Sequence, residues 1–179
     1  MKKIIKIGIP IVSIFLLIAC GNNENKKQEN PQDSETSVQI SKEPEIRIND
    51  DVLNAIYSQY ANLTVALAQD NLAEAKLAAN AIEAGAREIS NNSTLAESAA
   101  SIVSAPDINK QRAAYSKLSD EMVALLKKAG MAQAELYVEY CPMAFDNKGA
   151  VWISSTKEVR NPYFGEKMLK CGEVKEIIK

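Results

Sequence analysis

Apolar residues recur at alternating spacings of three and four across residues 50–130, which is the spacing of one face of an α-helix. Three sets have this spacing, and a shorter stretch at residues 94–104 also has helical character. We expect their side chains to form the core, so the pattern predicts three long helices and one short helix. The sets are Leu53, Ile56, Tyr60, Leu63 and Leu67; Leu72, Ala75, Ala79, Ile82, Ala86 and Ile89; and Tyr115, Leu118, Met122, Leu125 and Ala129.

Residues that begin or end helices stand at the boundaries of these sets. Thr94 and Glu97 have the spacing of a capping box, Pro106 ends the short helix, and Gly130 suits a helix C-terminus. Short connections favour antiparallel neighbours, so we expect an up-and-down bundle. The side chains expected to accept hydrogen bonds from the free amides of a first turn are Asp50, Asn71 and Asp107.

The pattern changes after Gly130. Residues 135–140 and 150–154 are rich in strand formers, and Asp146-Asn147-Lys148-Gly149 between them favours a turn in which Asn147 or Gly149 takes a positive φ. Asn161-Pro162 marks another turn, and residues 165–170 favour one helical turn. The predicted fold is therefore mainly α: an up-and-down bundle with a small C-terminal β-hairpin or irregular cysteine-containing tail, at about residues 134–175.

The N-terminus has the features of a lipoprotein signal peptide. Lysines precede an apolar run at residues 7–19 that is shorter than the ~20 residues a membrane span needs. The run ends at Leu17-Ile18-Ala19-Cys20-Gly21, which resembles a lipobox. We therefore expect cleavage after residue 19 and an acylated Cys20 that anchors the chain to a cell-envelope membrane facing the periplasm. Residues 20–48 would be a flexible tether, and residues 49–179 one helical domain.

The charge of the expected mature chain argues against one class of partner. The sequence has 21 basic and 23 acidic residues, and three of the basic residues lie in the signal segment. The remaining 18 basic residues are fewer than the acidic ones, which does not favour nucleic-acid binding. Histidine is absent, and no phosphate loop, nucleophile with its base, or Cys-x-x-Cys pair occurs, so we do not expect an enzyme.

Two short stretches each pair a thiol with a thioether. Cys141 and Met143 would point the same way from an extended segment, and Met168 and Cys171 would share one face of a helical turn. Such soft donors favour monovalent copper and, by analogy, silver. Structural zinc usually takes four Cys or His ligands, and calcium needs a loop of oxygen donors that the sequence lacks.

A disulfide explains the same cysteines. Two thiols remain once Cys20 is acylated, and pairs in an oxidising compartment usually form bridges. In the chain-entropy model, closing a loop of about 30 residues between Cys141 and Cys171 would stabilise the fold by about 3–4 kcal/mol. The residues leave both alternatives open, and a reducible pair would bind metal only in its reduced form.

The C-terminal tail resembles that of an uncharacterised family of bacterial exported helical domains. The stretches that carry the resemblance are Tyr140–Phe145, Asn147–Ser154 and Arg160–Val174. The family also occurs fused to periplasmic adaptor subunits of copper and silver efflux systems. The resemblance therefore implies a role in heavy-metal homeostasis, with a heavy-metal efflux system as the partner. The positions to which it assigns a metal-binding role are Cys141, Met143, Met168 and Cys171.

Overall fold

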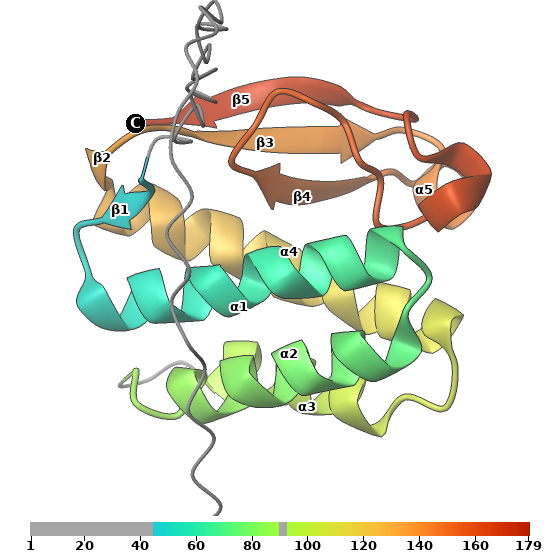
Figure 1. The fold of residues 1–179 in the computed structure, drawn as a ribbon, viewed down its shortest axis with the longest axis horizontal. Helices are drawn as coiled ribbons and strands as arrows, with labels where there is room; N and C mark the ends of the chain where they lie inside the picture. The colour runs from blue at the N-terminus through green and yellow to red at the C-terminus, as the bar shows by residue number, and fades with distance from the viewer. Residues whose placement is uncertain (1–44, 90–92) are drawn as a thin grey trace, which may run out of the picture. The chain divides into compact units, whose positions relative to one another are not determined.

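Four long helices make up most of the computed structural model, which describes residues 45–89 and 93–179 (Figure 1). They are α1 (Asp51–Ala68), α2 (Leu72–Ala86), α3 (Ser93–Ser104) and α4 (Ile108–Ala129). Each packs on the next helix in the chain, and α4 also contacts α1. The prediction of a mainly helical protein with small β-elements near its C-terminus is confirmed. The expected signal peptide, Cys20 and most of the expected tether lie outside the described residues.

The caps of the helices follow from the sequence. The Asp50 side chain accepts from the Leu53 amide at 2.8 Å, and Gly130 ends α4 with a φ of 71°. Asn71 and Asp107 cap α2 and α4 in the same way. The N-cap predicted at Thr94 is wrong, because α3 already includes Ser93. Within the described residues, no helix has both the length and the apolarity that crossing a bilayer requires.

The predicted apolar stripes form the core. Tyr60, Tyr115 and Met122 are fully buried, as are the alanines at which α2 approaches its neighbours. Tyr115 donates to the Tyr60 hydroxyl at 2.9 Å, and Tyr60 shares a 2.8 Å hydrogen bond with Ser119. These bonds let polar rings be buried at low cost. Four stripe residues are only half-buried: Leu72, Ile89, Leu125 and Ala129.

The tail forms a three-stranded antiparallel sheet in the order β4-β3-β5. The predicted hairpin is present as β3 (Leu136–Cys141) and β4 (Ala150–Ser154), and the predicted helical turn as the short 3-10 helix η1 (Gly165–Met168). The third strand, β5 (Glu173–Ile178), was not expected, because most of its residues are exposed and it lacks an alternating pattern. A second small sheet pairs β1 (Arg47–Ile48) with β2 (Met131–Gln133). Ile48 is buried there, although the sequence assigned it to the tether.

Left-handed residues shape the connection between β3 and β4. It contains the short segment α5 (Ala144–Asn147), in which Phe145 and Asp146 have φ values of 50° and 58°. Both Asn147 and Gly149 take the positive φ expected of one of them. The ring of Tyr140 packs so close to Gly149 that a Cβ there would lie 2.1 Å from the Tyr140 hydroxyl. A glycine is therefore needed at position 149.

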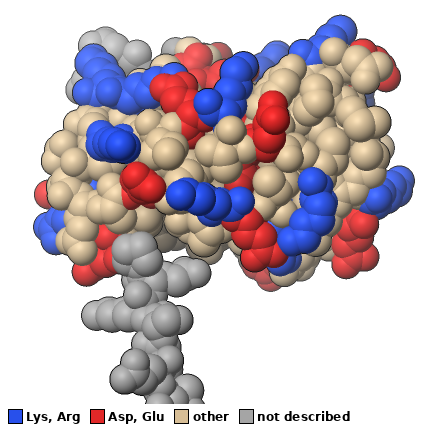
Figure 2. All heavy atoms as spheres, turned by 90° about the horizontal axis from the view of Figure 1, so that it is seen from above, with Lys and Arg blue, Asp and Glu red and all other residues tan. Residues whose placement is uncertain are grey.

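The sheet lies beside the helices with β4 nearest to them and β5 farthest away (Figure 1). Two tyrosine hydroxyls bind the backbone of β4. The Ile153 amide donates to Tyr60 at 3.1 Å, and the Tyr163 hydroxyl donates to the Val151 carbonyl. On the sheet side of the molecule, Lys and Arg are interspersed with Asp and Glu (Figure 2), as in the exposed 2.6 Å pair of Lys127 with Glu176.

Candidate metal or disulfide site

Cys141 and Cys171 meet on the tail. Cys141 is the last residue of β3 and is 0% exposed, whereas Cys171 is half-buried in the turn between η1 and β5. Their Sγ atoms lie 3.0 Å apart, and both cysteines are free. A disulfide has an S–S distance of about 2.05 Å. The structure therefore brings together the two thiols that the sequence singled out, without a bond between them.

Asn161 fixes the backbone around Cys171. It is fully buried, and its side-chain amide donates to the Cys171 carbonyl at 2.6 Å. Its side-chain carbonyl accepts from the amides of Tyr163 at 2.7 Å and Phe164 at 3.2 Å. The sequence predicted only a turn at Asn161-Pro162. The structure adds that three hydrogen bonds of the Asn161 side chain hold the loop that precedes Cys171.

Gly172 lets the thiol segment lie against the sheet. Its φ is 146°, and a Cβ there would be 2.7 Å from Trp152 Cη2 and 3.1 Å from the Tyr140 carbonyl oxygen. Trp152 is buried, and its ring packs edge-on against Tyr163, with centroids 5.9 Å apart. Trp152 and Tyr163 are therefore core residues. The indole also lies directly beneath the residue that follows Cys171.

A partly buried ion pair ties this loop to the helices. Arg112 of α4 donates to Asp70 at 2.7 Å and to the Pro162 carbonyl at 2.7 Å. Asp70 also accepts from the Glu166 amide at 3.3 Å. Desolvation raises the pKa of Asp70, but the hydrogen bonds from Arg112 and Glu166 outweigh it and leave the pKa lowered. A Cβ on Gly165 would lie 2.5 Å from the Arg112 guanidinium, so the loop needs a glycine where it crosses the pair.

The two methionines are placed differently from each other. Met168 is half-buried at the end of η1, and its carbonyl accepts from the Cys171 amide at 3.0 Å. Met143 is 47% exposed and lines a cavity of about 590 Å³ at the start of α4, a cavity that neither cysteine lines. The expectation that Cys141 and Met143 share an extended segment is wrong. β3 ends at Cys141, and Met143 has helical φ and ψ of −85° and −10°.

The donor atoms that this candidate site offers a ligand are sulfur atoms. Among the residues that the structure describes, no cluster of three or more His, Cys, Asp or Glu side chains is arranged to hold a metal. Cys171 differs from reactive, low-pKa cysteines, because the hydrogen bond with Cys141, desolvation and repulsion from that neighbour raise the pKa of Cys171 to about 11. Cys171 therefore keeps its proton at neutral pH. Only a ligand with a strong affinity for sulfur would displace this proton.

Glu139 is a buried carboxyl on the same strand. It lies two residues before Cys141, so β-strand alternation puts both side chains on one face of β3. It is 0% exposed, and neither carboxylate oxygen has a hydrogen bond of normal geometry. Burial raises the pKa of Glu139 to about 7, and the indole of Trp152 across the strand pair offsets this only in part. No sequence pattern singled out this residue.

Comparison with protein families matched part of the chain. Residues 56–134 match the model of a family described as "Protein of unknown function (DUF3347)". This range runs from within α1 to just after β2, so it ends before the strand that carries Cys141. Comparisons with curated proteins and with solved structures gave no match. The helical part thus resembles an uncharacterised domain family, and the thiol pair lies outside the matched range.

Proposed function

We propose that this chain is an exported, lipid-anchored binding protein in copper or silver homeostasis, in which Cys141 and Cys171 hold one monovalent ion. The observation that supports it most is the 3.0 Å approach of two free thiols from segments 30 residues apart. Two soft donors in a chain without histidine suit a soft monovalent ion better than zinc or calcium. The proposed activity is binding and not catalysis.

The neighbours of the thiols suggest how the ion would enter. Metal–sulfur bonds of about 2.3 Å require the two Sγ atoms to move apart from their 3.0 Å separation. Cys171 would make this movement, because it is half-buried in a turn, whereas Cys141 is held within β3. Met168 would be a further donor, since a backbone hydrogen bond keeps it within one turn of Cys171. The exposed Met143 would be an accessory donor.

The cellular setting of the proposal comes from the sequence. Acylation of Cys20 would hold the domain at a cell-envelope membrane, on a tether, with the up-and-down bundle carrying the metal-binding tail. The tail resembles domains that are fused to adaptor subunits of copper and silver efflux systems. We therefore propose that the chain takes up or delivers the ion beside such a system.

Competition for Cu(I) with a chromophoric chelator tests this function on the reduced full chain without oxygen. Cys141→Ser or Cys171→Ser should lower the affinity more than about 100-fold, because even residues that only orient metal ligands contribute about 10–100-fold. Met168→Leu should lower it less. In the unprocessed full chain Cys20 still has a free thiol, so Cys20→Ser is the matched control: it removes a thiol that is not part of the pair. Failure of the reduced chain to compete, or equal loss with Cys20→Ser, would rule out the proposed site.

The same 3.0 Å contact favours a second candidate, a non-catalytic interaction module stabilised by a Cys141–Cys171 disulfide. The sulfur atoms would have to approach by only about 1 Å to reach bonding distance. Thiol titration of the unfolded, unreduced mature protein separates the two proposals. Two free thiols per chain would exclude the bridge, and none would show that the metal site exists only after reduction.

A further inference from the structure

The outer face of α1 and α2 carries fewer charges than a solvated helix normally does, and the charged residues that line its hollows, Asp51 and Glu74, lie near the starts of the two helices. Asp51 is the only charged residue among the 18 of α1, whereas α4 has seven among 22. On α2, the exposed positions from the middle to the last turn are also uncharged: Leu77, Asn80, Ala81 and Ala84. Depletion of charged residues is a feature of the core of protein–protein interfaces.

The same face is hollowed along its length. One hollow of about 360 Å³ has Val65 and Leu77 on its rim, and these side chains are 47% and 66% exposed. The next hollow, of about 430 Å³, has the small residues Ala55, Ala81 and Gly85 in its wall. Gln59 lines both hollows, so they form one groove between the two helices. Three of the six exposed large apolar side chains of the described residues lie here: Val52, Val65 and Leu77.

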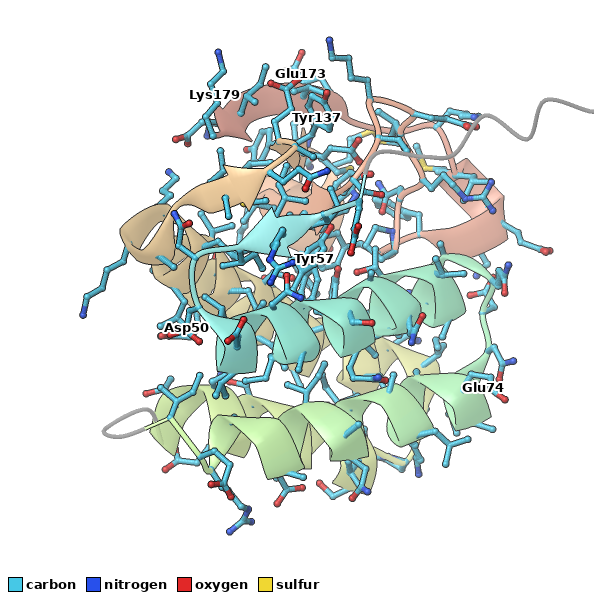
Figure 3. All side chains as sticks on the ribbon, turned by 60° about the vertical axis from the view of Figure 1, so that its left-hand side comes forward. Asp50, Tyr57, Glu74, Tyr137, Glu173 and Lys179 are labelled. Carbon is cyan, nitrogen blue, oxygen red and sulfur yellow. The ribbon has the colours of Figure 1, made fainter. Side chains whose placement is uncertain are left out.

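We propose that this face binds a second copy of the chain, about a two-fold axis that runs parallel to the helices. α1 and α2 are antiparallel: Asp50, the N-cap of α1, and Glu74, in the first turn of α2, lie at opposite ends of the pair (Figure 3). Rotation about such an axis places α1 of one copy over α2 of the other. Residues at the same position along the axis then face each other. Val65 then meets the partner's Leu77, because both line one hollow in a single chain.

The polar side chains of this face can form hydrogen bonds with the same face of a second copy. Gln59, Asn62 and Asn80 carry amides, which both donate and accept hydrogen bonds and can therefore pair across a two-fold axis. Oppositely charged residues at the ends of the face also meet under this axis. Asp51, at the start of α1, comes to the end of the partner's α2, where the side chain of Arg87 pairs with Glu83 of its own helix and is still 68% exposed.

The size of the face predicts a weak dimer. Helices of this length and width would bury on the order of 500 Å² per copy, or about 1,000 Å² in total. That is below the ~1,200–2,000 Å² of stable complexes, so we expect a weak, transient dimer that forms at high protein concentration. Confinement of both copies to one membrane, which rests on the proposed lipid anchor, would raise their effective concentration.

Sedimentation equilibrium of the full chain at concentrations up to about 1 mM tests the proposal. We expect a reversible dimer that Leu77→Asp weakens at least about 10-fold, because it buries a charge in each half of the interface. Ile177→Asp is the matched control: it makes the same change at an exposed apolar residue on β5, and should leave association unchanged. Asp51→Lys should weaken the dimer, and adding Arg87→Asp should restore it.

Three results would overturn the proposal. The chain could stay monomeric over the whole concentration range, or the two aspartate variants could weaken association equally. A chain that dimerises only after residues 1–44 are removed would show that this segment is what covers the face. None of these results depends on Cu(I) binding, so the dimer and the metal site are tested independently.

Discussion

The hydrogen bonds that cap the helices and those that fix the tail differ in range. Each side-chain cap of the helices joins residues three positions apart, as Asp107 does when it accepts from the Lys110 amide at 2.9 Å. In the tail, Asn161 reaches Cys171 ten residues away, and the Tyr60 hydroxyl accepts from an amide 93 residues away. The helices are therefore specified by local sequence. The geometry of the thiols depends on a few distant partners.

Because of this difference, we expect the tail to be more sensitive to single substitutions than the helices are. A cap can be lost without moving the next helix, because apolar burial along the whole stripe holds the helix in place. The segment at residues 155–172 has little regular structure, and the position of Cys171 relies on single side chains. The tail also contains the unpaired carboxyl of Glu139 and the left-handed Phe145 and Asp146. Such groups persist where the surrounding structure enforces them, which is common at functional sites.

The largest effect on stability should come from Asn161→Ala. The substitution leaves the Cys171 carbonyl and the Tyr163 and Phe164 amides without their partner. Each buried group left unpaired costs about 1–3 kcal/mol, so we expect a loss of roughly 3–5 kcal/mol in the free energy of unfolding. Urea unfolding measures this loss, with Asn109→Ala, at an exposed asparagine on α4, as the control. A loss below about 1 kcal/mol would mean that other contacts hold the loop.

A smaller effect, visible only as a function of pH, should come from Glu139→Gln. The folded pKa of about 7 lies above the ordinary value of 4.5, so the folded state favours the protonated carboxyl. Its contribution to stability is complete below pH ~4.5, falls as the pH rises, and is lost above pH ~7. Glutamine cannot ionise. It should therefore stabilise the protein at pH 8 relative to pH 4 by about 2 kcal/mol, after allowance for solvent screening.

Thermal unfolding at a series of pH values checks this expectation. Glu176→Gln provides the control, because Glu176 is exposed and its pair with Lys127 is a surface ion pair worth at most about 1 kcal/mol. Parallel curves for the wild type and Glu139→Gln would show that the carboxyl finds a partner or water in solution. A gain for Glu139→Gln only at high pH would show that the sheet buries an acid without a counter-charge.

The sequence predicted the helices well because their determinants are local. Stripe spacing and the caps at Asp50, Asn71 and Asp107 act within a few residues, and the structure has all of them. The error at Thr94 has the same origin, since a serine and a threonine stand side by side and either suits a first turn. The turn with Asn147 and Gly149 was also predictable, because each residue tolerates a positive φ by itself.

The tail was less predictable because its determinants are distant or lack a pattern. β5 pairs with β3 through a bulge, and the strand is mostly exposed, so no alternation marked it. Nothing near Asn161 indicated that its amide binds Cys171, and nothing near Glu139 indicated that both faces of β3 are buried. The approach of the two cysteines could be expected from their residue types and the expected compartment. Its 3.0 Å distance required the structure.

The smallest effect should come from Asp107→Ala, at the N-cap of α4. It removes a 2.9 Å bond to the Lys110 amide, and the loss of such a cap costs about 1 kcal/mol. Because the bond is local, the reactivity of Cys171 toward a thiol reagent should stay unchanged, whereas Asn161→Ala should increase it. If Asp107→Ala altered that reactivity as much as Asn161→Ala, the first turn of α4 would be coupled to the thiols through Arg112, and the helices and tail would behave as one unit.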